Sequence, residues 1–303
     1  METILVGTDD GIHRVGEEEK SWLRGKVVTA LARGQGALWA LADGRELWRE
    51  PLDGGGVAAS SPELRLNCLE VGDSEVVAGT SEARLVRMEG GELRRVDEFD
   101  RAEGRGGWYT PWGGPPDVRS LATGADGTLW VNVHVGGILR AEAGGFTPTI
   151  DVDADVHQVA ADPGEPRRVL AATAYGLALS DDAGATWSFA TEGMHAGYCR
   201  AVALAGEALL VSCSTGPRGD RATLYRRPLA AAPESSFERC RDGLPEWFER
   251  NIDTACLDAA GTTVAFGTAG GEVYVSADAG ASWTREAASL PPVRCLLLGW
   301  TPG

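Results

Sequence analysis

Short runs in which apolar and polar residues alternate recur along the whole chain. Alternation with a period of two places every second side chain on one face of a β-strand. No long stretch shows the 3.6-residue period of a helix, and the best helical candidate, PEWFERNI at Pro245, is long enough for only one or two turns. The pattern therefore predicts an all-β protein.

The predicted strands repeat in a fixed order. An apolar first strand is followed by a short loop, a second strand that often ends in Gly-Thr, a glycine turn and a third strand. Seven segments fit the first strand: VVTALA at Val27, LNCLEV at Leu66, VRSLAT at Val118, VHQVAA at Val156, CRAVAL at Cys199, TACLDA at Thr254 and VRCLLL at Val293. Their spacing averages about 44 residues, as in a propeller blade of four strands. We therefore predict a seven-bladed β-propeller of four-stranded antiparallel blades, with residues 1–303 forming a single domain.

The predicted strands at the two chain ends complement each other. ILVGT at Ile4 is a second-type strand with no first strand before it, and VRCLLL at Val293 is a first-type strand with no second strand after it. We expect the C-terminal strand to join the N-terminal blade, because this pairing closes the ring and removes a free sheet edge.

Two stretches share the motif Ser-x-Asp-x-Gly-x-Ser/Thr-Trp, at Ser180–Trp187 and at Ser276–Trp283. Serine and aspartate side chains bind turn backbone, glycine takes the strained turn position, and tryptophan packs underneath. We therefore expect the aspartates and tryptophans of both motifs to be structural.

The motif resembles the Asp-box of the BNR/Asp-box propeller superfamily, which includes sialidases and photosystem II assembly-factor propellers. The resemblance covers two blades strongly and implies that each box joins a third and a fourth strand, away from the ligand face. It also implies two kinds of function. One is a sialidase-like or glycosyl hydrolase-like enzyme, and the other is an assembly scaffold.

Polar residues gather at the second position of the aligned first strands. When VTALA at Val28 is aligned with the other six segments, this position holds Thr29, Asn67, Arg119, His157, Arg200, Ala255 and Arg294. In a propeller these strands start around one pocket, so Arg119, Arg200, Arg294 and Asn67 are candidate ligand-binding residues. Either nearby acids such as Asp117 and Asp155 neutralise the arginines, or the arginines bind a carboxylate, phosphate or sulfate.

Three insertions are expected on the same face. The first, from Arg101 to Asp117, carries Trp108, Tyr109 and Trp112, which form either a lid and stacking platform or a plug. The second, TEGMHAGYC at Thr191, brings His195 and Tyr198 beside Arg200. The third, from Pro228 to Asn251, supplies Glu246 as a candidate catalytic carboxylate.

Histidine is rare, with four residues in the chain, and three of them map to the predicted pocket. His134, His157 and His195 could bind a divalent metal ion with open positions for substrate. Alternatively, His157 and His195 act in acid–base catalysis, and His134 contacts the ligand. No motif spacing decides between a metal and no cofactor.

Charge and composition exclude some partners. A net charge of −16 argues against general binding to nucleic acid or to an anionic membrane, which both need a basic surface. The chain shows no targeting segment, and its six scattered cysteines fit buried free thiols in a reducing compartment. We therefore expect a cytoplasmic protein, compatible with a monomer.

The sequence thus leaves two classes of function open. The first is an arginine- and histidine-lined pocket that binds a small anionic molecule, with hydrolase or lyase activity if the protein is an enzyme. The second is a non-catalytic scaffold with a protein partner. A cleft with convergent polar groups favours the first class, and a flat or plugged mouth favours the second.

Overall fold

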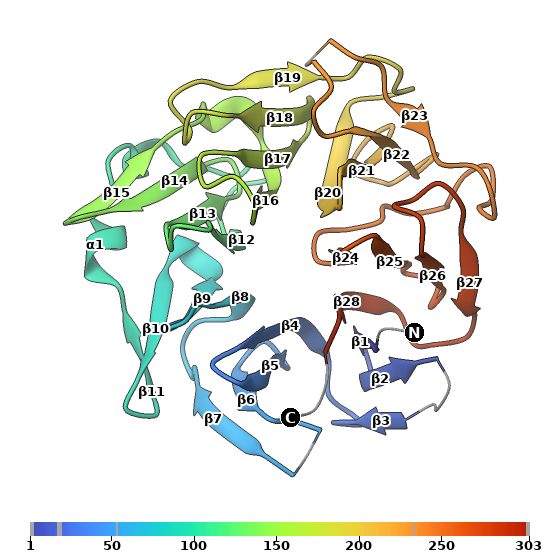
Figure 1. Ribbon diagram of the computed structural model, residues 1–303. Coiled ribbons are helices and arrows are strands. Elements are labelled where there is room, and N and C mark those ends of the chain that lie inside the picture. The colour runs from blue at the N-terminus through green and yellow to red at the C-terminus, as the bar shows by residue number, and fades with distance from the viewer. Residues whose placement is uncertain (1–2, 17–19, 53, 233, 301–303) are drawn as a thin grey trace. The chain divides into compact units, whose positions relative to one another are not determined.

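The computed structural model describes residues 3–16, 20–52, 54–232 and 234–300. Its strands form seven four-stranded antiparallel blades arranged as a β-propeller (Figure 1). Each blade is a meander of a first, second, third and fourth strand in adjacent positions. The predicted fold class is confirmed.

The strands follow the repeating order expected from the alternating pattern. The first strands are β4 (Val28–Gly34), β8 (Leu66–Val71), β12 (Val118–Thr123), β16 (Val156–Ala161), β20 (Tyr198–Ala205), β24 (Leu257–Ala260) and β28 (Val293–Leu298). The second strands are β1 (Ile4–Thr8), β5 (Ala37–Ala42), β9 (Val76–Thr80), β13 (Leu129–Val133), β17 (Val169–Thr173), β21 (Ala208–Ser214) and β25 (Thr263–Gly267).

The third and fourth strands complete the blades. The third strands are β2 (Gly11–Val15), β6 (Glu46–Arg49), β10 (Leu85–Glu89), β14 (Gly137–Glu142), β18 (Gly176–Ser180), β22 (Thr223–Pro228) and β26 (Val273–Ser276). The fourth strands are β3 (Lys20–Trp22), β7 (Gly56–Ser60), β11 (Glu92–Arg95), β15 (Gly145–Pro148), β19 (Ser188–Ala190), β23 (Glu238–Arg239) and β27 (Thr284–Ala287).

Helical structure is confined to short segments within the described part of the chain. They are the four-residue helix α1 (Asp97–Asp100) and the 3₁₀ turns η1 (Ser81–Ala83), η2 (Arg105–Gly107) and η3 (Val152–Ala154). None of the described helices has the length and apolar character needed to cross a membrane.

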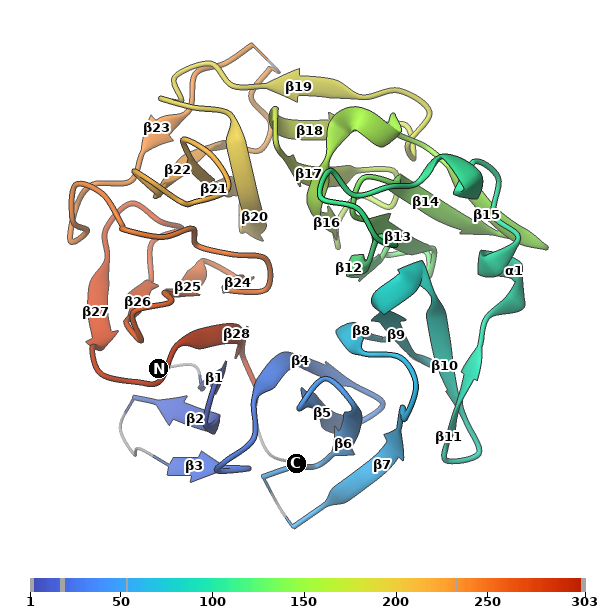
Figure 2. The same cartoon turned by 180° about the vertical axis from the view of Figure 1, so that it is seen from behind.

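The C-terminal strand completes the N-terminal blade, as predicted. Strand β28 pairs antiparallel with β1, so the sheet order of this blade is β28-β1-β2-β3. The two strands lie side by side in both views (Figures 1 and 2).

The chain divides into two compact units. The first unit comprises the described residues within 1–28, 172–178 and 189–303, and the second those within 29–171 and 179–188. In the first unit an aromatic group anchors the core, because the ring of Phe266 stacks on Tyr274 and meets Phe248 and Trp283 edge-on. In the second unit the buried residues form two clusters, one of which contains Phe99 and the other Trp39.

A glycine at or near the end of a second strand lets a neighbouring blade pack closely. Gly79 of β9 lies against Val118, the first residue of β12, and a methyl group at Gly79 would overlap Cγ1 of that valine. Gly267 faces Val293 in the same way. The Gly-Thr endings seen in the sequence therefore mark inter-blade contacts.

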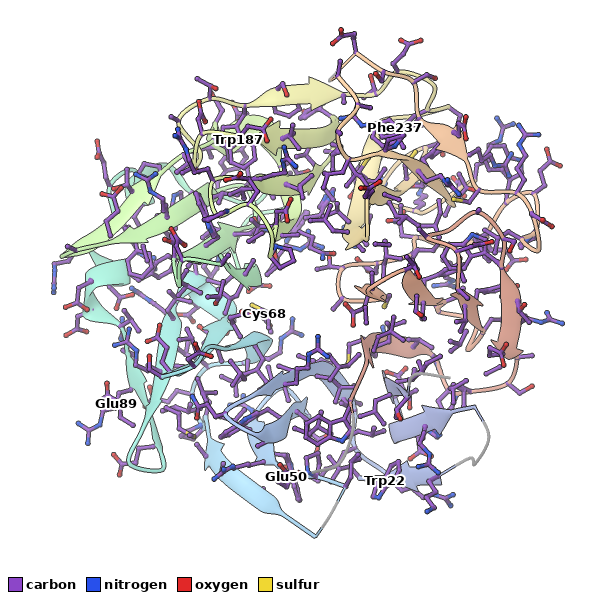
Figure 3. All side chains as sticks on the ribbon, viewed as in Figure 1. Trp22, Glu50, Cys68, Glu89, Trp187 and Phe237 are labelled. Atoms are coloured by element: carbon purple, nitrogen blue, oxygen red, sulfur yellow. The ribbon has the colours of Figure 1, made fainter. Side chains whose placement is uncertain are left out.

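Small residues at the third position of the first strands fill the space beside these glycines. The Cys68 thiol of β8 (Figure 3) contacts the Val118 carbonyl oxygen at 3.8 Å, and the Cys256 thiol contacts that of Val293 at 3.8 Å. Burial raises the pKa of Cys68 to about 12, so this thiol stays protonated and acts as a donor. All six cysteines are buried and free.

β-Bulges occur at the second position of several first strands. In β8, residues Leu66 and Cys68 pair with consecutive residues of β9, which leaves Asn67 as the extra residue. The register also shifts at Arg119 of β12, at Arg200 of β20 and at Arg294 of β28. A bulge bends the strand and re-aims a side chain, so the polar residues found by aligning the sequence occupy the places where the strand is irregular.

The two Ser-x-Asp-x-Gly-x-Ser/Thr-Trp motifs form the same hydrogen-bonded turn. They join β18 to β19 and β26 to β27, the positions expected from the resemblance. In the second turn Asp278 accepts hydrogen bonds from the Ser282 amide at 2.9 Å and the Ser282 hydroxyl at 2.6 Å. The buried Ser276 hydroxyl accepts a hydrogen bond from the Gly280 amide at 2.8 Å. Both motifs therefore have the structural role that we predicted.

The glycine contact between blades is testable by substitution. We expect Gly79→Ala to lower the free energy of unfolding by about 1–3 kcal/mol, because the added methyl overpacks the contact with Val118. Chemical denaturation measures the loss. Gly56→Ala is the matched control, since Gly56 also lies in a strand and has open space around its Cα. A Gly79→Ala loss of the same size in a Val118→Ala background would contradict the assigned contact.

The Asp278 turn makes a pH prediction. The hydrogen bonds from Ser282 lower the pKa of Asp278 from 3.8 to about 2. The folded-state pKa lies below the unfolded one, so this carboxylate stabilises the fold above about pH 4 and loses that contribution as the pH falls toward 2. Ser282→Ala should move the Asp278 titration upward, as followed by carboxyl-carbon NMR. Asp182, whose pKa is also about 2, should not move, and an unchanged Asp278 would refute the account.

Candidate functional site

A small cavity in the first unit is lined by four arginines. Its volume is about 250 Å³, and its cationic residues are Arg200, Arg218, Arg250 and Arg294. They come from the starts of β20 and β28, from the β21–β22 loop and from the loop that enters β24. We call this cavity the arginine pocket.

Carboxylates hold two of the four arginines in place. Arg200, whose side chain is 15% exposed, contacts both oxygens of Asp253, at 2.8 and 2.9 Å. Arg294 makes a bidentate contact with Asp9, from Nε at 2.6 Å and Nη2 at 2.8 Å. The Arg294 hydrogen bond lowers the pKa of Asp9. Burial favours the neutral form of Arg200, but Asp253 and Tyr198 more than offset this and raise the arginine's pKa.

Arg218 and Arg250 are exposed and have no ion pair or side-chain hydrogen bond to any residue that the structure describes. The loops that carry them are tied together, because the Asn251 side chain donates to the Pro217 carbonyl at 3.2 Å. Asp253 is the one acidic residue of the described lining. The pocket therefore carries excess positive charge in a chain whose net charge is −16, an arrangement that attracts an anion.

Sequence reasoning found two of these arginines and missed two. Arg200 and Arg294 occupy the second position of first strands, where polar residues stand out in the alignment. Arg218 and Arg250 lie in the loop sequences STGPRGD and ERNID, which have no periodicity. One feature of the sequence could have identified Arg218 and Arg250. Both arginines lie in loops at the end of the blades where the first strands start.

Arg119 belongs to the second unit and faces a different group. Its charge acts on Asp155, the residue directly before β16. Burial favours the neutral form of Asp155, but the hydrogen bond from His134 and the charges of His157, His134 and Arg119 hold its pKa below the ordinary value. This carboxyl group is therefore ionised at neutral pH.

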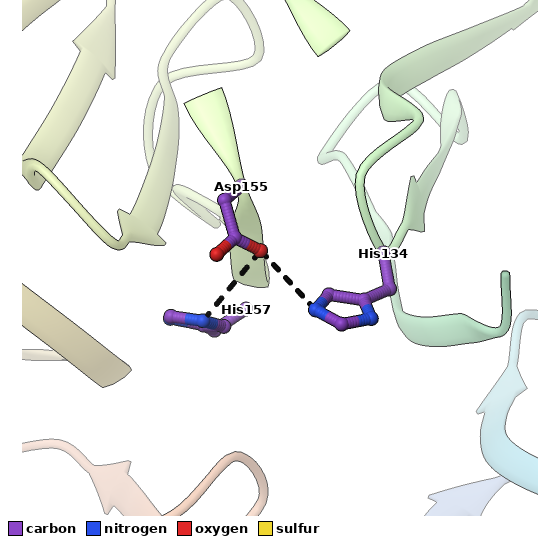
Figure 4. A group of neighbouring side chains, drawn as sticks. All are labelled: His134, Asp155 and His157. Atoms are coloured by element: carbon purple, nitrogen blue, oxygen red, sulfur yellow. Dashed lines mark ion pairs between the residues drawn. The ribbon is translucent and has the colours of Figure 1, made fainter. Parts of the chain in front are cut away.

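Asp155 brings His134 and His157 together (Figure 4). The Nε2 atom of His134 lies 3.2 Å from Asp155 Oδ1, and that of His157 lies 3.8 Å from the same oxygen. His134 follows β13, and His157 is the second residue of β16. We call these three residues the histidine cluster. Sequence reasoning selected both histidines and treated Asp155 as a neutralising acid.

The aromatic insertion divides into anchors and an exposed tip. Trp108 packs on the Phe99 ring at 5.6 Å and under the Arg105 guanidinium at 4.8 Å. The Tyr109 hydroxyl donates to Asp153 at 3.0 Å. Trp112 is 73% exposed, and its ring centroid lies 5.0 Å from that of His134. Trp112 is therefore the aromatic side chain placed to cover the histidine cluster.

His195 lies in the first unit within an aromatic and cationic group. Its Nδ1 is 3.0 Å from the Tyr225 hydroxyl, and its ring lies 4.7 Å from Trp247. Burial and the charges of Arg239 and Arg221 lower the pKa of His195, so the imidazole is neutral at pH 7. Joint action of His195 with His134 and His157, in metal binding or catalysis, stays a prediction.

The remaining candidates have local partners or solvent around them. The Asn67 side-chain oxygen accepts a hydrogen bond from Arg65 at 3.0 Å, and its nitrogen donates one to the Val118 carbonyl at 3.4 Å. Both polar atoms of this side chain are therefore used in contacts within the fold. The Tyr198 hydroxyl accepts from Arg200 at 3.4 Å and so supports the arginine pocket. Glu246 is exposed beside Trp247.

No family model matches the sequence, and no curated protein matches it. Solved structures share its fold. YCF48 from Cyanidioschyzon merolae aligns with a TM-score of 0.59 and 13% identity over 86% of this chain and 84% of its own. A catalytically inactive virginiamycin B lyase from Staphylococcus aureus, solved with quinupristin, aligns with a TM-score of 0.60 and 13% identity over 87% and 84%.

A GH74 enzyme of Niastella koreensis aligns with a TM-score of 0.57 and 10% identity over 94% of this chain and 47% of its own. At these identities the likeness shows the propeller fold alone. Because the group contains enzymes as well as YCF48, the fold does not select a function.

Proposed function

We propose that this protein is a binding propeller whose arginine pocket takes a small anionic molecule with a carboxylate or phosphate group. The observation that carries the proposal is the pairing pattern of the four arginines. Asp253 and Asp9 hold Arg200 and Arg294, while Arg218 and Arg250 line the same cavity without an ion pair to any described residue.

The arrangement suits oxyanions that present two neighbouring oxygens. A guanidinium group offers parallel N–H donors that match the two oxygens of a carboxylate or phosphate, and its charge does not titrate in the physiological range. Asp253 and Asp9 neutralise the two paired arginines, which form part of the pocket wall. The volume of about 250 Å³ is slightly below the usual range for ligand sites, which favours a ligand of few atoms.

Binding without glycoside hydrolysis follows from the acids of the pocket. Most glycosidases need two carboxylates, about 5 Å or about 6.5–9.5 Å apart. The described lining supplies Asp253 alone, and Arg200 holds this residue. We therefore place the sialidase-like and lyase hypotheses behind simple ligand binding.

Two further parts of the proposal have separate support. The paired Ser-x-Asp-x-Gly-x-Ser/Thr-Trp turns favour membership of the BNR/Asp-box superfamily. The six buried free thiols favour a reducing, cytoplasmic location. An assembly scaffold is the second candidate, and it predicts no binding of small anions in the pocket.

Calorimetric titration with phosphate, sulfate and small di- and tricarboxylates tests the proposal. We expect at least one of these anions to bind with one-to-one stoichiometry. Arg218→Gln and Arg250→Gln should each weaken binding at least about tenfold, equivalent to about 1.4 kcal/mol, because each removes one guanidinium contact. Their thermal unfolding should stay at the wild-type temperature, since neither side chain has an ion pair or side-chain hydrogen bond to a described residue.

Arg241→Gln is the matched control, because Arg241 is an exposed arginine of the same unit that does not line the pocket. This variant should bind the anion as the wild type does. If no anion in the panel binds, or if all three variants bind equally well, the arginine pocket is not the ligand site.

A further inference from the structure

The histidine cluster has the composition of a metal site. His134, Asp155 and His157 each offer one ligand atom, and the three atoms lie within 4.8 Å of one another. Ligand atoms on one ion with bonds of about 2.0–2.2 Å lie about 3–4 Å apart. The separations of 3.2 and 3.8 Å from Asp155 Oδ1 to the two Nε2 atoms fit this range, and the two imidazoles, at up to 4.8 Å, would have to close slightly around an ion.

The donor set selects the kind of ion. Two imidazoles and one carboxylate suit zinc, iron, nickel or copper, whereas magnesium and calcium prefer sites made of oxygen ligands. Both imidazoles are buried, with His157 at 0% and His134 at 7% exposure. An ion bound to these two imidazoles would therefore be partly shielded from water. This shielding strengthens the attraction between the ion and the Asp155 carboxylate.

The backbone around two of the three residues is strained. Asp155 has φ of 45°, and Val135, the residue after His134, has φ of 46°. A β-branched residue at positive φ is an outlier. Such strain costs on the order of 1–3 kcal/mol per residue and is often kept where it positions functional groups. Here the two residues lie in the β13–β14 loop and directly before β16.

We propose that His134, Asp155 and His157 bind one divalent transition-metal ion, such as zinc. Three protein ligands leave at least one coordination position open for water or another ligand. The exposed Trp112 ring lies tilted beside His134, with 5.0 Å between the ring centroids. This site belongs to the second unit and shares no residue with the described lining of the arginine pocket.

A substitution of Arg119 distinguishes two hypotheses for the histidine cluster. Either the cluster binds a metal ion, or its three residues only hold two loops together. The positive charge of Arg119 acts on the Asp155 carboxylate and repels a bound cation. Arg119→Gln should therefore tighten metal binding, although it adds no ligand. A trio that exists only to join two loops would bind no metal in either form.

The test uses the untagged full chain, stripped with a chelator and titrated with Zn²⁺ by calorimetry and with Co²⁺ by visible absorption. We expect one ion per chain and a Co²⁺ spectrum without a thiolate charge-transfer band. His134→Gln and Asp155→Asn should each weaken Zn²⁺ binding more than about tenfold. His13→Gln is the control variant and should bind as the wild type does.

Fluorescence adds a local readout. Ni²⁺ should quench tryptophan emission, and Trp112→Phe should remove part of this quenching while calorimetric binding persists. Circular dichroism and thermal unfolding establish that each variant is folded. Absence of stoichiometric binding to the wild type would overturn the proposal, as would binding that His134→Gln and Asp155→Asn leave intact. A thiolate signature in the Co²⁺ spectrum would also overturn it.

Discussion

The close contact between a second-strand glycine and the first valine of the next first strand sets the spacing of neighbouring blades. Gly79 with Val118 and Gly267 with Val293 are two copies of this contact, one in each unit. A side chain at the glycine would push the neighbouring strand away. The cysteine thiols beside the contact bond to the valine carbonyls, which adds a weak polar link to a mainly steric constraint.

The functional groups depend on this spacing because they sit one residue further along the same strands. The bulges at Arg119 and Arg294 interrupt the ladder directly after the packed valine, and a bulge also occurs at Arg200 of β20. At Arg294 the packed Val293 and Cys295 lie on either side of the polar residue that the bulge re-aims. The arginine pocket and the histidine cluster both combine residues at first-strand starts with residues of adjoining loops, so one architectural position supports two different chemistries.

Much of the fold could be predicted because alternation and turn chemistry are local. The predicted start of one first strand was wrong. The segment TACLDA predicts a strand from Thr254, but β24 begins at Leu257. Ala255 has φ of 63° and Thr254 is held by Asp253, so the chain turns there before it becomes extended. Arg218 and Arg250 could not be predicted, since loop geometry decides where they point. Asp155 was noticed as an acid, but its contact with two imidazoles depends on a left-handed backbone that the sequence does not reveal.

The central claim is that Arg218 and Arg250, which have no ion pair with a described residue, bind one anion in the arginine pocket. A crystal structure of the full chain grown in phosphate tests this most directly. The account predicts a phosphate within hydrogen-bond distance of both side chains, with the Arg200–Asp253 and Arg294–Asp9 pairs intact. A crystal with an empty pocket, or with Arg218 and Arg250 turned away from a phosphate bound elsewhere, would contradict it.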